Sequence, residues 1–544
     1  MRSVTDNPTA MNANALAVPL SRPVSAPALR EMLVDNKELA LVDVREELIF
    51  SKNHLLLARS IPLSRFELKF ARLVPRRATR IVLCDDNDGL AARAAALLLR
   101  SGYSDVAVLA GGVAAWAAAG FELFSGVNVP SKAFGEFIEH TSNTPGISAG
   151  ELEQLIREGA DIAILDSRPF DEYVRVSIPT AVNVPGAELV LRAREIAPSP
   201  KTTVVVNCAG RTRSIIGAQS LINAGLPNKV MALRNGTMGW NLAGFACESG
   251  KNRRAPGVSE ETLEWARQAA QRVADSCGVT VIDRAKLDAL RAETERTVYL
   301  FDVRDPAEYL AGHMPGAISA PGGQLVQATD QYVGTLGARI VLVDDAEVRA
   351  LMTGSWLRQM GWREVFVLPA AGTEIGWPAV PVLDTETPTN AALDLAEFGE
   401  LFARNDATVV DLSLSREYLR EHIPGAWFAI RSRLDRVLRK IPVRGTLVLT
   451  SEDGVVASLA VAEAEALSGT TVRFLTGGNA AWKAAGYELS AEPLMADEAA
   501  DQWRKPYERS GDVTAAMKEY LAWEIDLLPR IERDGLLSFS RYRG

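Results

Sequence analysis

The chain has 544 residues, of which 47% are hydrophobic and 23% are charged, and its formal net charge is −9. At about 150 residues per domain, this length predicts roughly three to five domains, each with an ordinary buried core. The acidic balance provides no basic surface for nucleic acid or anionic lipid, so both partner classes are excluded.

Residues 1–23 are predicted to form an N-terminal tail. The tail lacks the continuous apolar segment of a signal peptide, and no later stretch reaches the roughly 18 uninterrupted apolar residues of a membrane helix. The sequence therefore predicts a cytoplasmic protein that makes no membrane contact.

From residue 24 onwards, the same order of signals recurs four times. Each copy begins with a short apolar strand that ends in Asp, passes through a Pro-containing turn into a second strand and a helix, and closes with a turn that contains Gly and Trp. The strand-end residues are Asp43, Asp166, Asp302 and Asp411, and the closing residues are Trp116, Trp240, Trp377 and Trp482. The interval from Asp to Trp is 71 to 75 residues in every copy, which indicates a tandem repeat.

Strands and helices alternate within each copy. Apolar runs such as "TVVVNC" and "RIVLVD" lie between helical stretches such as "AARAAALLLRSG". This alternation predicts an α/β fold with a mainly parallel sheet and helices on both faces. We expect the four Asp residues to be structural, with Arg45, Arg168 and Arg304 as partners, and the Trp residues to be core anchors.

The motifs of the four copies resemble the rhodanese domain. Asp-x-Arg is followed by Glu-Tyr, by His-x-Pro-Gly-Ala, by a strand, Cys, loop and helix, and by Gly-Gly-x-x-x-Trp, although no single copy carries every element. The resemblance implies four tandem rhodanese-like domains at residues 24–126, 130–250, 258–384 and 390–491. Residues 492–544, which include "MKEYLAWEIDLLPRI", are predicted as an amphipathic helical extension that packs on a domain or a partner.

Similarity to rhodanese implies a sulfurtransferase in which a loop cysteine carries a persulfide, without a metal or an organic cofactor. Counted from the Asp of each copy, the loop position holds Cys84, Cys208, Val343 and Thr450. The third and fourth copies are therefore predicted to be catalytically silent. We expect an inactive first copy to pack on an active second copy, followed by a second pair.

The two cysteine loops carry opposite charge. Cys84 is followed by Asp85, Asp86 and Asp88, whereas Cys208 is followed by Arg211 and Arg213. Cationic side chains and a helix N-terminus favour the thiolate, which is the nucleophilic form of cysteine. Cys208 is therefore predicted as the catalytic residue, and Cys84 as a structural thiol with a minor site as the alternative.

The resemblance also implies that loop amides cradle the persulfide. The predicted substrate-binding residues are Ala209, Gly210, Arg211, Thr212, Arg213 and Ser214, of which Ser214 is expected to cap the next helix. In the predicted double displacement, Cys208 takes sulfur from thiosulfate or another small anionic donor and passes it to a thiol or cyanide. Many family loops have Gly in place of Arg211, which leaves the loop dihedrals and the direction of that guanidinium open.

The remaining cysteines and the histidines predict no further chemistry. The four cysteines are too few for a disulfide framework and form no Cys-x-x-Cys pair, so they indicate free thiols in a reducing compartment. The four histidines are scattered without metal-ligand spacing.

Other interpretations stay open at this point. Cys208 is either a nucleophile or a buried structural cysteine, and the chain is either an enzyme or a persulfide-binding scaffold. A cysteine phosphatase is a third function, but its loop has one more residue between Cys and Arg than the four between Cys208 and Arg213. The sequence is also compatible with a homo-oligomer.

Overall fold

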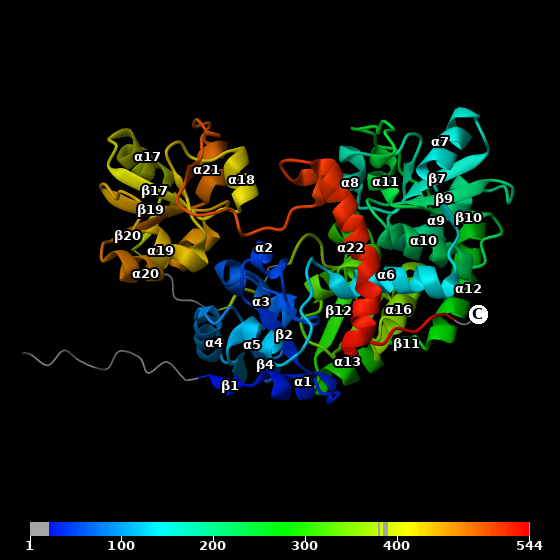
Figure 1. The fold of residues 1–544 in the computed structure, drawn as a ribbon, viewed down its shortest axis with the longest axis horizontal. Helices are drawn as coiled ribbons and strands as arrows, with labels where there is room; N and C mark the ends of the chain where they lie inside the picture. Colours follow the sequence, from blue (N-terminus) through cyan, green and yellow to red (C-terminus); the bar gives the residue numbers. More distant parts are fainter. Residues whose placement is uncertain (1–20, 371, 379–380, 384–389, 543–544) are drawn as a thin grey trace, which may run out of the picture.

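Four parallel sheets follow one another along the chain, and each sheet defines one unit of the fold (Figure 1). The computed structural model describes residues 21–370, 372–378, 381–383 and 390–542. Most of the predicted N-terminal tail, residues 1–20, lies outside the described residues. The predicted α/β class, with four rhodanese-like domains and a C-terminal helical extension, is confirmed.

Unit 1 has the strand order β1-β5-β4-β2-β3. Its strands are β1 (Arg22–Val24), β2 (Ala40–Asp43), β3 (Arg59–Ser60), β4 (Arg80–Cys84) and β5 (Asp105–Leu109). Its helices are α1 (Ala26–Val34), α2 (Glu47–Phe50), the 3₁₀ helix η1 (Leu63–Arg65), α3 (Phe66–Leu73), α4 (Leu90–Arg100) and α5 (Gly112–Ala118). The helix α6 (Val129–Ser142) then leads into unit 2.

Unit 2 repeats this order as β6-β10-β9-β7-β8. Its strands are β6 (Gly146–Ile147), β7 (Ile162–Asp166), β8 (Val182–Asn183), β9 (Thr203–Asn207) and β10 (Val230–Leu233). Its helices are α7 (Ala149–Arg157), α8 (Phe170–Arg175), η2 (Gly186–Glu188), α9 (Leu189–Ile196), α10 (Thr212–Asn223) and α11 (Gly236–Leu242). The long helix α12 (Glu260–Cys277) connects it to unit 3.

Unit 3 has the order β11-β15-β14-β12-β13. Its strands are β11 (Thr280–Val281), β12 (Val298–Asp302), β13 (Ile318–Ser319), β14 (Arg339–Asp344) and β15 (Val365–Pro369). Its helices are α13 (Arg284–Ala292), α14 (Pro306–Ala311), α15 (Gly322–Gln327), η3 (Thr329–Gln331) and α16 (Val348–Gln359).

Unit 4 adds a sixth strand to the pattern, in the order β16-β20-β19-β17-β18-β21. Its strands are β16 (Ala392–Leu393), β17 (Ala407–Asp411), β18 (Trp427–Phe428), β19 (Thr446–Thr450), β20 (Val472–Leu475) and β21 (Leu494–Met495). Its helices are α17 (Leu395–Ala403), α18 (Ser415–Arg420), η4 (Arg431–Arg433), α19 (Leu434–Val437), α20 (Val455–Ser468) and α21 (Gly478–Ala484). The extension contributes β21 to this sheet and continues through η5 (Pro506–Glu508) and α22 (Val513–Asp534).

Helices cover both faces of each sheet because successive strand residues point to opposite sides. In unit 1, Val42 and Leu83 belong to the core beneath α3 and α4, whereas the neighbouring Leu41 and Val82 belong to the core beneath α1 and α5. Strands buried on both faces explain the uninterrupted apolar runs in the sequence.

The structural roles expected for the repeated Asp and Trp residues are largely confirmed. Arg168 donates from Nε and Nη2 to the buried carboxylate of Asp166, and the pairs Asp43–Arg45 and Asp302–Arg304 are equivalent. Trp116, Trp240 and Trp482 are buried, and each indole N–H donates to a carbonyl six residues ahead. The expectation is wrong for Trp377, which is exposed.

The units do not pack in the pairs that the sequence predicts. Units 2 and 3 share one continuous core, in which Trp356 of α16 donates to Ser220 of α10 at 2.9 Å and packs edge-on against Phe134 of α6. Unit 1 packs on unit 4, where Nη1 and Nη2 of Arg431 donate to the buried carboxylate of Glu67. The expected pairs of copy 1 with 2 and copy 3 with 4 are therefore wrong, because the buried faces of α9, α10, α12 and α16 pack against one another.

Candidate functional site

The predicted nucleophile lies where a buried strand meets a helix. The valine-rich strand β9 ends at Asn207, Cys208 follows, and α10 begins at Thr212. The Cys208 side chain is 2% exposed, and its Sγ lies 3.5 Å from Ser214 Oγ. The carboxyl ends of parallel strands are the usual position for ligands in such sheets.

Strand register corrects the positions that the sequence count assigned to the other copies. Asp166 pairs with Asn207, and the equivalent residues Asp43, Asp302 and Asp411 pair with Cys84, Val343 and Thr450. Cys84 is therefore equivalent to Asn207, not to Cys208. The counterparts of Cys208 are Asp85, Asp344 and Ser451, because Cys208 lies one residue beyond the position that pairs with the repeated Asp.

The backbone confirms this register. The carbonyl of Cys208 accepts the N–H of Thr237, as the carbonyls of Asp85 and Ser451 accept those of Val113 and Asn479. Gly236 allows this contact, because a Cβ at Gly236 would lie 2.3 Å from the Cys208 carbonyl oxygen. The loop and the turn before α11 are thus held together without space for a side chain.

In units 1, 3 and 4, the side chain at the position of Cys208 is anionic or polar and binds the loop amides. Asp85 accepts the backbone N–H groups of Asn87 and Ala91, each at 2.9 Å. Asp344 accepts those of Ala346 and Arg349 at 3.1 and 2.8 Å. Backbone amides after a strand end therefore form an anion cradle in this fold, and only unit 2 places a sulfur atom in it.

The sequence predicts that Arg211 favours the Cys208 thiolate. In the structure, Arg211 instead binds acidic residues of α6. Its guanidinium is bound by Glu136 and Glu139 of α6 and donates to Asn235 Oδ1 at 3.2 Å. Burial raises the pKa of Glu136, and the ion pair with Arg211 opposes that rise. Arg211 therefore anchors the loop to α6, and its φ of −117° shows that the position needs no glycine.

Arg213 supplies the cationic group that remains beside Cys208. Its Nη2 lies 2.9 Å from Glu172 Oε2, and its Nη1 lies 3.3 Å from Gln324 Oε1 of unit 3. Although burial alone would lower it, the pKa of Arg213 is raised by Glu172 and, to a smaller extent, by a thiolate at Cys208. Arg213 and Cys208 therefore line the same cavity.

Ser214 stabilises the loop in a different way from the one expected. The residue at the N-cap position of α10 is Arg211, and Ser214 lies inside the first turn, where its hydroxyl donates to the Arg211 carbonyl at 2.8 Å. The predicted helix cap is therefore wrong. Ser214 Oγ instead lies beside the Cys208 sulfur.

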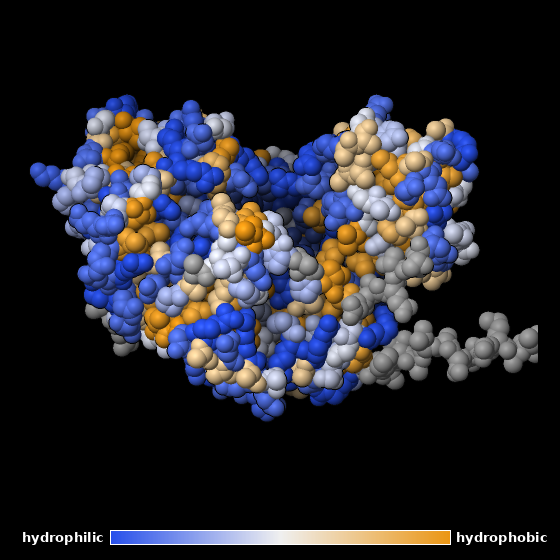
Figure 2. Space-filling view, turned by 180° about the vertical axis from the view of Figure 1, so that it is seen from behind, coloured by the Kyte–Doolittle hydropathy of each residue, from blue (hydrophilic) through white to orange (hydrophobic). Residues whose placement is uncertain are grey.

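A cavity of about 340 Å³ opens above the whole Cys208 loop. All six residues from Cys208 to Arg213 line it, so the predicted loop residues are brought together. The other walls come from unit 2 (Glu172, Arg175), unit 3 (Gln324, Gln327), unit 4 (Arg416) and the extension (Trp503, Lys505, Tyr507). Seen from behind, the molecule is hollowed between the lobes formed by units 2 and 4, and hydrophilic residues dominate the recess (Figure 2).

The other cysteines lie in less reactive surroundings. Burial raises the pKa of Cys84 well above its usual range, and the neighbouring Asp43 adds to this rise. Burial also raises the pKa of Cys247, and it raises the pKa of Cys277 to about 11. All four cysteines are free thiols.

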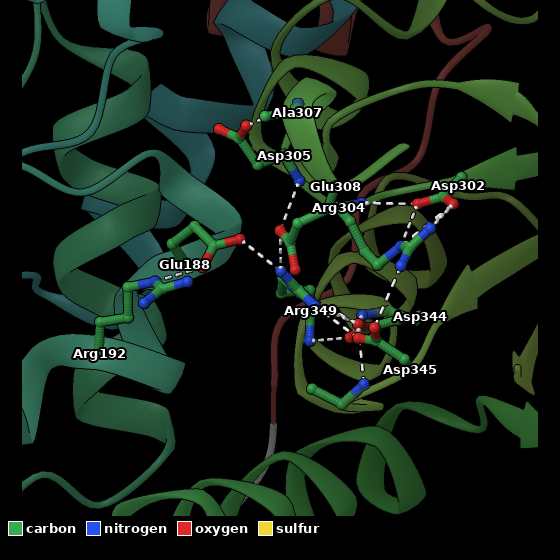
Figure 3. A network of polar contacts seen from close by, with 12 residues as sticks. Glu188, Arg192, Asp302, Arg304, Asp305, Ala307, Glu308, Asp344, Asp345 and Arg349 are labelled. Carbon is green, nitrogen blue, oxygen red and sulfur yellow. Dashed lines mark hydrogen bonds and ion pairs between the residues drawn. The ribbon is translucent and has the colours of Figure 1, made fainter. Parts of the chain in front are cut away.

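The loop of unit 3 shows how the same geometry is closed to a ligand (Figure 3). Arg349 is equivalent to Arg213, and it contacts four carboxylates: Asp344, Asp345, Glu308 and, across the unit interface, Glu188. Glu308 and Glu188 are the counterparts of Glu172 and Gln324. Units 2 and 3 therefore face each other with approximate twofold symmetry, but only unit 3 fills its own anion site.

Sequence reasoning missed four residues of the site. Glu136 and Lys505 carry no motif, and Gln324 lies in a unit judged silent. Glu172 belongs to the repeated Glu-Tyr motif, and its spacing from Asp166 equals that of Glu308 from Asp302. That repeated spacing was a usable signal for the Arg213–Glu172 pair.

The described part of the chain has neither a membrane-spanning helix nor a cluster of metal-binding side chains. No helix there has both the length and the apolar character that a bilayer crossing requires. Within the same residues, no three His, Cys, Asp or Glu side chains gather in a way that could hold a metal ion.

Comparison with known proteins agrees with this geometry. The Rhodanese-like domain family matches residues 25–119, 148–243, 283–371 and 394–485. A crystal structure of thiosulfate sulfurtransferase from Pseudomonas aeruginosa shares 47% identity, with 96% of this chain and 100% of that chain covered and a TM-score of 0.93. SseB of Mycobacterium tuberculosis, a candidate thiosulfate sulfurtransferase, is 29% identical over 237 residues, which cover 37% of this chain and 78% of SseB. The chain belongs to the rhodanese-like family and is a rhodanese-type sulfurtransferase.

Proposed function

We propose that Cys208 carries sulfane sulfur from thiosulfate or a persulfide donor to a thiol or cyanide acceptor. The observation that supports this most strongly is the strand register. Of the four equivalent positions, 85, 208, 344 and 451, only position 208 has a thiol. The names of the two relatives favour thiosulfate as the donor.

The proposed reaction has two displacements. The Cys208 thiolate attacks the outer sulfur of thiosulfate, a sulfur–sulfur bond forms to Cys208, and the bond to the sulfonate sulfur breaks with release of sulfite. The acceptor thiolate or cyanide then attacks the terminal sulfur of the Cys208 persulfide. A new persulfide or thiocyanate leaves, and the Cys208 thiolate is restored without a net change in oxidation state.

The loop residues have separate roles in this proposal. The amides of Ala209, Gly210, Arg211, Thr212 and Arg213 hold the terminal sulfur, as amides in the silent units hold Asp85 and Asp344. The Arg213 guanidinium favours the charge on the sulfur and on the departing sulfite. Ser214 Oγ accepts the Cys208 S–H and so orients the thiol before it ionises. This cycle needs no metal or organic cofactor.

Steady-state turnover of thiosulfate with cyanide tests the proposal. Cys208→Ser should abolish thiocyanate formation, and Cys84→Ala should retain it. Full activity of Cys208→Ser would refute the proposed nucleophile. Retention of bound sulfur by Cys208 without turnover would instead favour a persulfide-binding scaffold, the function suggested by three units without a thiol at this position. Turnover of p-nitrophenyl phosphate would favour a phosphatase.

The proposed cycle also fits a reducing compartment. Four free thiols and the need for a reduced Cys208 support a cytoplasmic location. The partners proposed are therefore small anionic sulfur donors and thiol acceptors, without nucleic acid or membrane.

A further inference from the structure

The C-terminal extension packs directly on the Cys208 loop, although more than 270 residues separate them in sequence. Its long helix α22 runs beside α6 (Figure 1). Met517 and Leu521 of α22 form one apolar cluster with Ala209 and Met238 of unit 2. The extension is therefore a fixed part of the site.

Contact with the loop is close at Gly210. A Cβ on Gly210 would lie 3.2 Å from Glu524 Oε2 and 3.7 Å from the ring of Tyr520. Glu524 is fully buried and binds Lys132 Nζ at 2.9 Å. These contacts place α22 against the back of the loop and leave the segment before it to face the cavity.

The segment before α22, which includes η5, forms ion pairs with units 2 and 4. Glu508 of η5 lies 3.0 Å from Arg175 of unit 2 and 3.8 Å from Arg416 of unit 4. Both arginines line the cavity, as do Lys505 and Tyr507. The ion pairs of Glu508 therefore hold Lys505 over the opening above Cys208.

Lys505 reaches the charged group that flanks the nucleophile. Its Nζ lies 3.1 Å from Glu172 Oε1, while Arg213 binds the same carboxylate at 2.9 Å. Burial lowers the pKa of Lys505, and Glu172 opposes this effect. Although burial would raise the pKa of Glu172, Arg213 and Lys505 hold it well below its usual range.

One carboxylate thus balances two cations, which leaves one positive charge in excess beside Cys208. The Lys505 side chain is 34% exposed, so its ammonium group is accessible from the cavity. We propose that Lys505 binds the anionic sulfur donor together with Arg213 and that the C-terminal extension is therefore part of the donor site. This inference rests on the proposed function of Cys208.

Substitution of Lys505 in the full-length protein tests the inference. Lys505→Gln should raise the KM for thiosulfate about tenfold, because one charge that faces the donor is lost. Its kcat should stay within about twofold of wild type, since Cys208 and Arg213 remain. Lys505→Arg should restore a KM within about threefold of wild type. Lys518→Gln, which removes an exposed lysine from α22 of the same extension, is the matched control and should leave KM unchanged.

Inhibition by sulfate supplies a second readout, because sulfate carries the charge of the donor but has no sulfur atom that can be transferred. Sulfate should compete with thiosulfate, and Lys505→Gln should weaken its inhibition by a similar factor. An unchanged KM with a reduced kcat in Lys505→Gln would overturn the donor-site role and leave the proposed function intact. A wild-type protein without Cys208-dependent turnover would overturn both.

Discussion

The loops of units 2 and 3 have the same backbone plan and opposite chemistry. In unit 2, Arg213 shares Glu172 with Lys505 and faces the neutral Gln324. In unit 3, the equivalent Arg349 is surrounded by four carboxylates, one of which stands where unit 2 has its sulfur. The comparison shows that an anion cradle is a property of the fold, whereas its availability to a substrate depends on which side chains of the chain already fill it.

Units 3 and 4 also contribute to the cavity over Cys208. Gln324 of unit 3 and Arg416 of unit 4 line the cavity over Cys208, and Gly186 and Gly323 allow units 2 and 3 to approach within backbone contact. Units 3 and 4 therefore determine part of the shape and charge of the pocket, although they have no thiol at the position of Cys208. Their retention does not require a second activity.

Among the variants that test the difference between the units, Gly236→Ala is expected to lower thiosulfate turnover most. The new Cβ would lie 2.3 Å from the Cys208 carbonyl oxygen and force the loop to move. A displacement of about 1 Å at the nucleophile can lower kcat/KM about a hundredfold, and we expect a loss of that size in thiosulfate turnover.

Gly478→Ala is the matched control for this variant. Its Cβ would lie 2.1 Å from the Ser451 carbonyl oxygen in the equivalent turn of unit 4. Both variants should lose about 1–3 kcal/mol of stability in thermal unfolding, because both glycines have positive φ and no space for a side chain. Equal activity of the two proteins would contradict the assignment of unit 2 as the active unit.

A smaller loss of thiosulfate turnover is expected when the interface partners of Arg213 and Arg349 are exchanged. Gln324→Glu would give Arg213 the carboxylate that Glu188 gives Arg349. The added negative charge should lower kcat/KM for thiosulfate about tenfold, which corresponds to about 1.4 kcal/mol. The reverse change, Glu188→Gln, alters the surroundings of Arg349 in unit 3 and should leave kcat/KM within about twofold of wild type. Thiosulfate kinetics of both variants check this, and a gain of activity in Gln324→Glu would disprove the charge argument.

The smallest effect is expected from Cys84→Ala. Cys84 is fully buried in an apolar cluster and occupies the position of Asn207, and its raised pKa keeps it a neutral thiol. Thiosulfate turnover should stay within about twofold of wild type, with a stability loss of about 1 kcal/mol from the small cavity. Alkylation by iodoacetamide should label Cys208 well before Cys84, and preferential labelling of Cys84 would reverse the ranking of the two sites.

The local sequence pattern is sufficient to predict the fold, and it correctly places Cys208 in a loop between a strand and a helix. The repeat of Asp and Trp at near-equal intervals marked four units, and the apolar runs fixed their parallel strands. The count from Asp failed by one residue because Cys84 closes its strand and Cys208 follows its strand, a difference that only cross-strand register reveals.

Long-range contacts explain the other errors. The charge of Arg211 suggested a partner for the thiol, but its pairing with Glu136 and Glu139 depends on how α6 packs against α10. Lys505 and Gln324 reach Cys208 only through the association of units 2 and 3 and the return of the extension. No spacing in the sequence predicts these long-range contacts. The packing of unit 1 on unit 4 cannot be predicted from the sequence for the same reason.

Mass measurement of the Cys208-containing peptide tests the central claim most directly. The protein would be incubated with thiosulfate in the absence of acceptor, digested and measured, then treated with cyanide and measured again. The Cys208 peptide should gain one sulfur atom and lose it to cyanide as an equal amount of thiocyanate appears. Turnover with an unmodified Cys208, or with the added sulfur on Cys84, Cys247 or Cys277 instead, would contradict the account.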